Sequence, residues 1–261
     1  ADSKYSHIRL WGSIGFIVAA LSLGVMIDSY GERSLIYALL ITQLVIFFLA
    51  FILPEKKINF TKFNKRSIWP ILKQREVIML LLSCALMVSS HGLLYNFYSI
   101  FLEDHSYSGA TIGLLWSVGV VFEILIFLLM PKILSKFTLK SVLLTSIAFA
   151  VLRFFLIGAY VDSILILIAA QIMHAATFGS FHVASIQLIA HFFYNEHQAR
   201  GQSLYNSITY GVGGAIGGLG GGYMIEYSGM ANTFMLSAIL PFVGFFVLLL
   251  GLKTKFKAEF K

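Results

Sequence analysis

The sequence predicts an all-α integral membrane protein. Apolar residues make up 58% of the 261 residues, whereas charged residues make up only 12%. A soluble domain does not need so much apolar surface, but a lipid-facing exterior does. Apolar stretches of about 20 residues recur along the chain, and this is the length that an α-helix needs to cross a bilayer. The single cysteine, Cys84, lies in one of these stretches and excludes an intrachain disulfide.

Eight apolar stretches are predicted to be transmembrane helices. They lie at residues 11–28, 34–53, 77–102, 109–131, 138–160, 162–192, 199–225 and 231–252. The stretch at 162–192 is longer than a bilayer requires and is expected to project beyond the membrane. The stretch at 199–225 holds eight glycines between Gly211 and Gly222. Glycine disfavours a helix in water, but in lipid it allows two helices to pack closely.

The distribution of basic residues supports this number of helices. When alternate loops are assigned to the cytoplasm, all of the 19 lysines and arginines except Arg33 and Arg153 fall on one side. This is the asymmetry that the positive-inside rule describes. The net charge of +7 therefore indicates membrane topology rather than a nucleic-acid-binding surface. Both ends of the chain are predicted to face the cytoplasm.

One long, basic loop divides the chain. Residues 54–76 contain Trp69 and two prolines, and they are predicted to form a cytoplasmic linker between two helical bundles. Residues 1–53 would then hold the last two helices of an N-terminal bundle, and residues 77–261 a C-terminal six-helix bundle with a cytoplasmic tail. Many transporters are built from two repeats with the substrate site between them. The chain is therefore expected to be the C-terminal part of a longer protein.

Two ionisable residues lie in the middle of predicted helices, where a charge costs at least about 2.5–3.5 kcal/mol. They are Glu123 and Arg153. A carboxylate that moves between an apolar environment and the vicinity of an arginine can bind and release a proton. The two residues therefore favour proton coupling, with a purely structural ion pair as the alternative.

Further polar and aromatic residues recur at helical spacing on four helices, so that the residues of each helix share a face. We expect these faces to converge on one cavity. The residues concerned are His91, Tyr95, Tyr98, Trp116, Gln171, His174, His182, Asn206 and Tyr210. Ordinary helix packing is the alternative for the tyrosines, and a hydrogen bond to a neighbouring helix carbonyl is the alternative for His174. The sequence shows no hydrolytic triad, metal-ligand spacing or phosphate-binding loop, so no catalytic residue, metal or cofactor is predicted.

Four segments together resemble the phenylpropionic acid permease group of the major facilitator superfamily, which is related to lactose permease and the nucleoside–proton symporters. They are SHIRLWGSIGFIVA, GLLWSVGVVFEILIF, QIMHAATFGSFHVAS and RGQSLYNSITYGVGGAIGG. The resemblance covers essentially the whole chain. It implies a major facilitator fold of twelve transmembrane helices, of which this chain would supply helices five to twelve.

The resemblance also implies roles for individual residues. Arg9 stands where lactose permease has its sugar-binding arginine, and Phe16 stands where it has a tryptophan that stacks on the sugar. Glu123, Arg153 and His174 match its glutamate on helix eight, arginine on helix nine and histidine on helix ten. By this comparison Arg9 and Phe16 join the substrate-binding residues, and the other three carry proton coupling.

One departure from lactose permease changes the expected proton site. Thr177 stands where lactose permease has its proton-binding glutamate, so Glu123 is the expected protonated group here, with Arg153 modulating it. The expected function is proton-coupled symport, by alternating access, of an aromatic acid such as 3-phenylpropionate. A sugar or a nucleoside is the alternative substrate, and a non-transporting membrane sensor or a truncated remnant is the alternative of another class.

The expected partners are a small-molecule substrate, protons and the lipid bilayer, but no nucleic acid. The complete protein is expected to be a monomer in a bacterial plasma membrane, and no enzymatic activity is expected.

Overall fold

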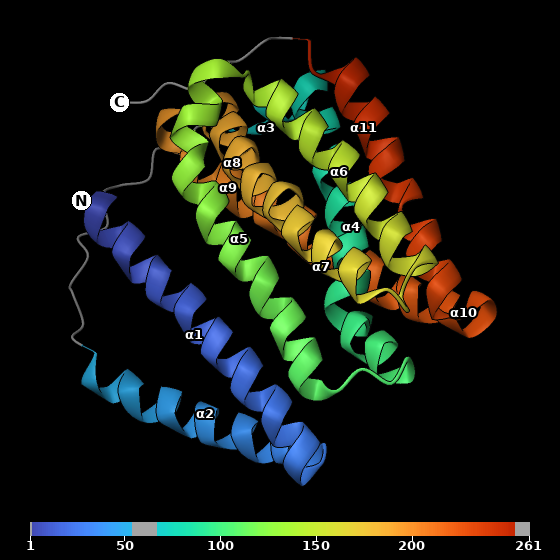
Figure 1. The fold of residues 1–261 in the computed structure, drawn as a ribbon. Coiled ribbons are helices and arrows are strands. Elements are labelled where there is room, and N and C mark those ends of the chain that lie inside the picture. Colours follow the sequence, from blue (N-terminus) through green and yellow to red (C-terminus); the bar gives the residue numbers. More distant parts are fainter. Residues whose placement is uncertain (1, 54–66, 254–261) are drawn as a thin grey trace.

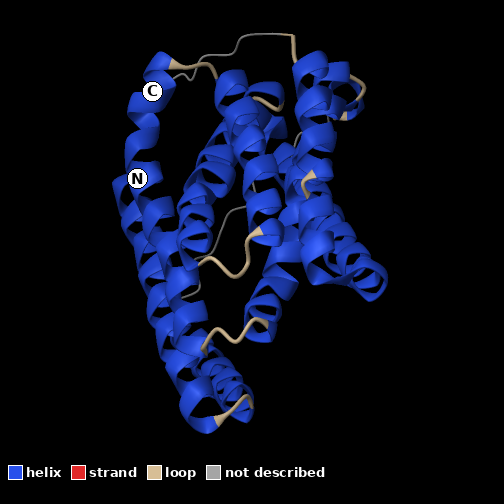
Figure 2. Ribbon diagram, turned by 45° about the vertical axis from the view of Figure 1, so that its right-hand side comes forward, coloured by secondary structure: helices blue, strands red, loops and turns tan. Residues whose placement is uncertain are grey.

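The described part of the chain is helical throughout. The computed structural model describes residues 2–53 and 67–253, with side chains from Trp11 onward. Every regular element in these ranges is a helix, which confirms the all-α prediction (Figures 1 and 2). Seven helical segments there are long and apolar enough to cross a membrane. The last segment, Asn195–Gly251, breaks at Gly229, where φ is 77° and ψ is 165°, and therefore supplies two of the eight predicted passes.

Most helices begin and end close to the predicted positions, but α1 begins at Asp2, nine residues before the predicted start. In chain order they are α1 (Asp2–Tyr30), α2 (Arg33–Ile52), α3 (Trp69–Leu72), α4 (Arg75–Asp104), α5 (Gly109–Lys136), α6 (Leu139–Ala159), α7 (Ile164–His174), η1 (Ala175–Ser180), α8 (Phe181–Phe192), η2 (Asn195–His197), α9 (Gln198–Asn206), η3 (Ser207–Gly213), η4 (Ile216–Gly220), α10 (Gly221–Ser237) and α11 (Ile239–Gly251). Of the predicted linker, residues 54–66 lie outside the described residues, and the division of the chain into two bundles stays a prediction.

Figure 1 shows how the helices are arranged. The pair α1 and α2 lies at one edge of the molecule, and α1 runs along α5. Helix α4 packs against α11 and against the glycine-rich segments η3 and η4, while α6 packs against α10, α11 and α8. Helix α5 thus separates the first two helices from the rest, with α1 on one side and α7 and η1 on the other.

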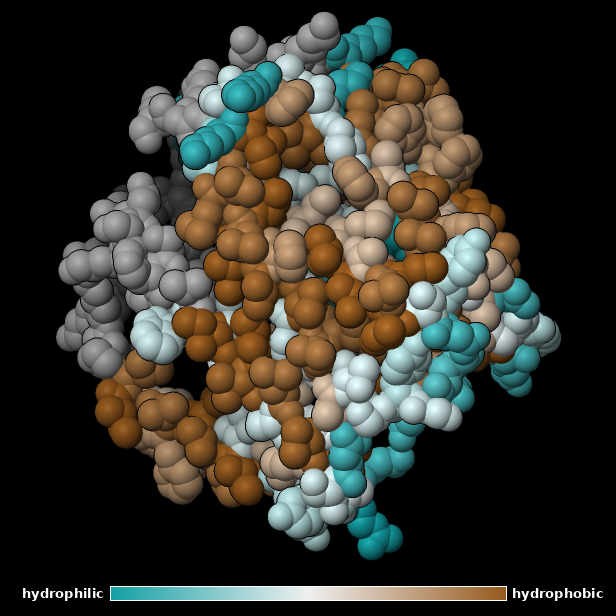
Figure 3. All heavy atoms as spheres, viewed as in Figure 1, coloured by the Kyte–Doolittle hydropathy of each residue, from teal (hydrophilic) through white to brown (hydrophobic). Residues whose placement is uncertain are grey.

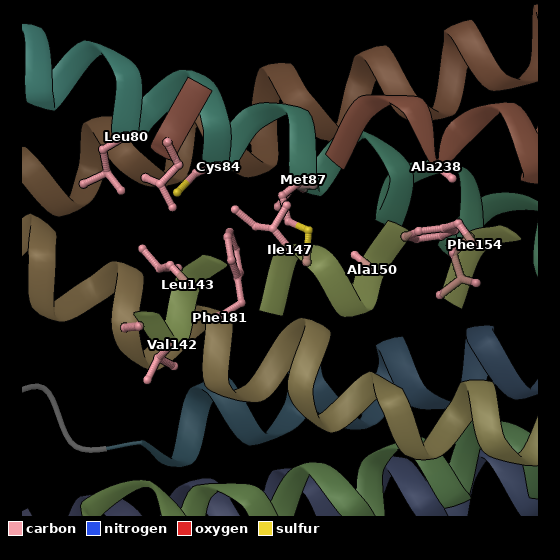
Figure 4. Packing of buried hydrophobic residues seen from close by; sticks show 14 of the residues in the cluster. Leu80, Cys84, Met87, Val142, Leu143, Ile147, Ala150, Phe154, Phe181 and Ala238 are labelled. Carbon is pink, nitrogen blue, oxygen red and sulfur yellow. The ribbon is translucent and has the colours of Figure 1, made fainter. Parts of the chain in front are cut away.

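The hydrophobic core lies between α4, α6 and α8. Leu80 and Met87 of α4 meet Leu143 and Ile147 of α6 there, as Figure 4 shows. Cys84 is buried in the same cluster, as expected of a small apolar side chain. The outer face is also apolar: Figure 3 shows a mostly hydrophobic band across α5 and α6, with hydrophilic residues at its ends. Such a band suits contact with lipid chains.

Two of the predicted spans are not continuous α-helices. The span at 162–192 contains the π-helical segment η1, and the glycine-rich span contains η3 and η4, also π-helical. Glycine is needed in this span because the backbones nearly touch. A Cβ atom at Gly217 would overlap the carbonyl oxygen of Ser89, and one at Gly213 would lie 2.7 Å from that of Ala85. The glycines thus allow this span to lie directly against α4.

Candidate functional site

A cavity of about 390 Å³ lies between α1 and the helices that follow the linker. Its walls come from α1, α4, α5, α7 and η1. The lining residues are Gly12, Ser13, Phe16, Tyr95, Trp116, Val120, Glu123, His174 and Phe178. Hollows of about 490 and 560 Å³ lie elsewhere on the molecule. The smaller cavity is the candidate site because its wall contains the mid-helix glutamate.

Aromatic rings form one part of the cavity wall. The rings of Tyr95 and Trp116 are nearly parallel, with an angle of 20° and 6.0 Å between their centroids. The indole nitrogen of Trp116 donates a hydrogen bond to Ser99 Oγ at 3.0 Å, which fixes the orientation of the ring. Phe178 meets Tyr95 edge-on at 6.5 Å. These rings offer flat surfaces against which an apolar or aromatic ligand can stack.

The polar part of the wall is a chain of three residues from different helices. Glu123 Oε2 of α5 lies 3.7 Å from His174 Nε2 of α7, and His174 Nδ1 lies 3.1 Å from Arg153 Nη1 of α6. A guanidinium group can only donate hydrogen bonds, so His174 Nδ1 accepts. In the neutral imidazole, the proton is thereby assigned to Nε2, on the side of Glu123. His174 therefore connects the carboxylate in the cavity wall with the arginine behind it.

Arg153 is fully buried and is held by neighbouring acceptors. Its Nε donates to the carbonyl oxygen of Ala170 at 2.8 Å, Nη1 also donates to Thr177 Oγ1 at 3.2 Å, and Nη2 donates to Gln171 Oε1 at 3.3 Å. A buried charge is tolerated only with such partners. Thr177, noted in the sequence as a departure from lactose permease, is one of the groups that hold this arginine.

The contacts of Arg153 and His174 bear on the alternatives left open for these residues. Among the described residues, the contacts of Arg153 do not include Glu123, because His174 lies between the two. Glu123 and Arg153 are thus linked through His174, and both the structural role and the role in proton coupling stay predictions. His174 likewise contacts two side chains of other helices instead of only a helix carbonyl.

Three predicted residues lie behind the cavity wall. His91 is buried, bonds through Nδ1 to the Met87 carbonyl of its own helix at 3.1 Å, and packs edge-on against Phe154. Tyr98 is buried against Trp116, with 5.5 Å between the ring centroids. Gln171 accepts a hydrogen bond from Arg153, as described above. None of the three is among the cavity-lining residues, and their role in substrate binding stays a prediction.

The glycine-rich span does not contribute to the lining, contrary to the expected convergence of four helix faces. Asn206 is exposed, and Tyr210 contacts His182, with 3.1 Å between the hydroxyl and Nδ1. The ring of Phe178 is nearly parallel to those of His174 and His182, and it links this pair to the cavity. Helix α1 takes the place of the glycine-rich span in the wall. Arg9 belongs to α1, but its side chain lies outside the described residues.

Four lining residues, Gly12, Ser13, Val120 and Phe178, were not among the site residues predicted from the sequence, although a signal for each exists. Ser13 lies three residues before Phe16, on the same face of α1, and Phe178 lies four residues after His174. Helical spacing of three or four places residues side by side. Gly12 and Val120 lie at the same spacings from Phe16 and Glu123, so extending each candidate by one turn would have found all four.

Comparison with known proteins gives the family. The profile of the MFS_1 like family matches residues 1–236. The probable 3-phenylpropionic acid transporter of Escherichia coli K12 is 30% identical over 86% of this chain and 60% of its own length. The uncharacterized transporter YwbF of Bacillus subtilis 168 is 25% identical over 94% of this chain and 61% of its own length. The chain thus spans about three fifths of the length of these relatives.

Solved structures give the fold. A crystal structure of a mutant of the nucleoside transporter NupG matches with a TM-score of 0.80 and 21% identity, over 95% of this chain and 68% of that one. A further NupG structure matches with a TM-score of 0.72. The fold and the family predicted from the four segments are therefore confirmed. The chain belongs to the MFS_1 like family and is a multi-pass membrane protein with the major facilitator fold.

Proposed function

We propose that the protein is a transporter that couples the movement of a small aromatic acid, such as 3-phenylpropionate, to that of a proton. The observation that carries the proposal is Glu123, a carboxylate in the wall of an aromatic-lined cavity that is linked through His174 to a buried arginine. The relative from Escherichia coli named as a probable 3-phenylpropionic acid transporter supports the choice of substrate.

The aromatic part of the substrate would stack on the cavity wall. Tyr95 and Trp116 offer nearly parallel faces, and Phe16 of α1 lines the same space. A phenyl ring in this space would contact both α1 and the helices that follow the linker. Such a contact lets a substrate bias the relative position of two parts of a transporter, as alternating access requires.

The charge of Glu123 would couple the substrate to the proton. A substrate carboxylate that enters the cavity beside an ionised Glu123 meets a like charge at close range in a poorly solvated space. Protonation of Glu123 removes this repulsion, so the anion and the proton enter together. After the substrate leaves, Glu123 releases its proton and the carboxylate again lies beside His174, 3.7 Å from its Nε2.

Uptake into membrane vesicles tests the proposal. Vesicles that contain the full-length transporter should accumulate labelled 3-phenylpropionate when a pH gradient is imposed, and a protonophore should abolish the accumulation. Glu123→Gln should also abolish it, because the neutral amide cannot exchange a proton. The exposed Glu226 offers the matched control, and Glu226→Gln should accumulate normally. Accumulation that survives either the protonophore or Glu123→Gln would contradict proton coupling through this residue.

A nucleoside is the second candidate substrate, and one feature of the cavity favours it. Among the lining residues that the structure describes, Glu123 is the only acidic group, and no lysine or arginine faces the space. A neutral ligand with an aromatic base would fit such a lining. Nucleoside permease NupG of Escherichia coli K12 is 24% identical over 95% of this chain and 63% of its own length. Labelled uridine in the same vesicles separates the two substrates, and uptake of neither would favour a non-transporting sensor.

We further propose that the complete protein is a monomer in a bacterial plasma membrane, with its basic loops in the cytoplasm. Protease cleavage at the basic loops only in inside-out vesicles would support the orientation. A dimer mass by light scattering in detergent would contradict the monomer.

A further inference from the structure

A further hollow lies on the outer surface of the molecule, and its lining differs from that of the cavity described above. It is a groove of about 320 Å³ between α4 and α11, and its lining includes Arg75, Met79, Phe242, Phe246 and Leu250. Its volume is about ten times the ~30 Å³ that a water molecule occupies in the liquid. Phe242 and Phe246 are 52% and 44% exposed, so the groove faces the surroundings of the protein. In a membrane protein these surroundings are lipid chains.

The groove is apolar except at one end, where Arg75 begins α4. Arg75 is exposed and makes no hydrogen bond or ion pair within the part of the chain that the structure describes. The groups around it are otherwise engaged. Glu76 accepts a hydrogen bond from the backbone nitrogen of Lys253 at 2.9 Å, and Lys140 Nζ donates to the carbonyl oxygen of Leu249 at 3.0 Å. Arg75 is therefore a cation placed at the mouth of an apolar groove.

The charges near the groove mouth favour an anionic ligand. Lys73 lies two residues before Arg75, and Lys253 is brought to the start of α4 by the hydrogen bond to Glu76. A guanidinium group binds phosphate oxygens through paired hydrogen bonds. Basic pockets between transmembrane helices bind the headgroups of anionic lipids. A ligand that satisfies both parts of the site has a long apolar chain and a phosphate.

We propose that this groove binds one anionic phospholipid, with an acyl chain against Phe242 and Phe246 and its phosphate on Arg75. The groove on the other side of α11 provides an internal comparison. It is larger, about 490 Å³, and is lined by Thr145, Phe149 and Phe245 with no charged residue. Under this proposal, that groove would take acyl chains without a preference for the headgroup.

Native mass spectrometry of the full-length protein in detergent tests the proposal. The probes are dioleoyl phosphatidylglycerol and dioleoyl phosphatidylcholine, which carry the same chains, and glycerol phosphate, which carries no chain. The first lipid should bind about fivefold more tightly than the second, the effect of about one cation near a lipid headgroup. Glycerol phosphate should not bind. Equal binding of the two lipids, or binding of glycerol phosphate as tight as that of the anionic lipid, overturns the proposal.

Four variants test the location of the site. Arg75→Gln should reduce binding of the anionic lipid to the level of the zwitterionic one, and Arg75→Lys should retain part of the preference. Val243 is exposed and lines the groove, so Val243→Trp should fill the groove while leaving Arg75 in place. This variant should weaken binding of the anionic lipid. Thr145→Trp fills the opposite groove and should leave the preference unchanged. A preference that survives Arg75→Gln, or that only Thr145→Trp removes, overturns the assignment to this groove.

Discussion

The helix pair α1 and α5 is closed along one half and open along the other. In the closed half, the carboxylate of Asp28 accepts hydrogen bonds from the backbone nitrogens of Gly109 at 2.6 Å and Ala110 at 2.8 Å. These two residues begin α5, where backbone N–H groups have no partner within the helix. The last turns of α1 thus cap the start of α5.

Glycines complete the closed half. A Cβ atom at Gly24 would overlap the carbonyl oxygen of Gly109, and one at Gly113 would overlap that of Ala20. In the open half the same helix carries Gly12 and Gly15, and nothing lies within 4 Å of a Cβ atom built at either. The cavity occupies this half, with Phe16 in its wall.

The contrast shows that small residues do not by themselves bring two helices together. What distinguishes the halves is the distance from each glycine to the backbone of α5. In the closed half a backbone carbonyl faces Gly24, whereas in the open half the bulky side chains of Trp116 and Phe16 line the space between the helices. The open space thus coincides with the bulky aromatic side chains of the two helices.

The largest effect is expected where the closed half is broken. Gly113→Ala places a methyl group against the backbone of Ala20, and a backbone cannot move aside as the end of a side chain can. We expect the free energy of unfolding to fall by about 2 kcal/mol, the usual cost of overpacking. Reversible unfolding in mixed micelles measures this change. A fall of less than about 0.5 kcal/mol would show that the contact at Gly113 is loose.

A labelling experiment measures the difference between the halves directly. Cys84 is the single cysteine and is buried, so it gives little background reaction. We expect Ser13→Cys, in the cavity wall, to react with a small thiol reagent about tenfold faster than Ser117→Cys, which is buried on α5 one turn after Gly113, because reactivity follows exposure of the thiol. Equal rates would mean that the two halves open equally in solution.

A smaller effect is expected from the cap. Asp28→Ala removes two hydrogen bonds from the start of α5 and should cost about 1 kcal/mol of unfolding free energy, as loss of a helix cap does. Asp28→Asn keeps one acceptor oxygen, so its free energy of unfolding should lie between those of the wild-type protein and Asp28→Ala. Glu32 is the matched control, because it precedes α2 without making a side-chain cap. A loss as large in Glu32→Ala would show that the negative charge, and not the cap, is what stabilises this end.

The sequence predicts much of this structure, but not the difference between the closed and open halves of the α1–α5 pair. Apolar stretches and basic loops predict the helices and their number because helix length and charge follow from the bilayer itself. The pairing of Glu123, Arg153 and His174 follows only in part. Their helices and depths are visible in the sequence, but the order Glu123–His174–Arg153 depends on how α5, α6 and α7 rotate against one another. The spacing of residues within one helix does not predict how that helix is rotated against its neighbours.

Tyr210 and Gly12 show the same limit. Tyr210 shares a face with other polar residues, yet its helix turns that face to His182 instead of to the cavity. Gly12 and Gly24 both lie among apolar residues of α1. The local sequence does not distinguish them, and only the position of the opposing helix does. Contacts between helices far apart in the chain decide which glycine is required.

The smallest effect is expected at Gly12, and its sign is opposite to that at Gly113. Because nothing lies near a Cβ atom at Gly12, Gly12→Ala adds a methyl group in open space. Alanine loses less conformational freedom in a helix than glycine, so we expect the free energy of unfolding to rise by about 0.5 kcal/mol. The same unfolding assay in mixed micelles compares this variant with Gly113→Ala. If both substitutions destabilise the protein equally, the open half is packed as tightly as the closed half, and the cavity between α1 and α5 closes in solution.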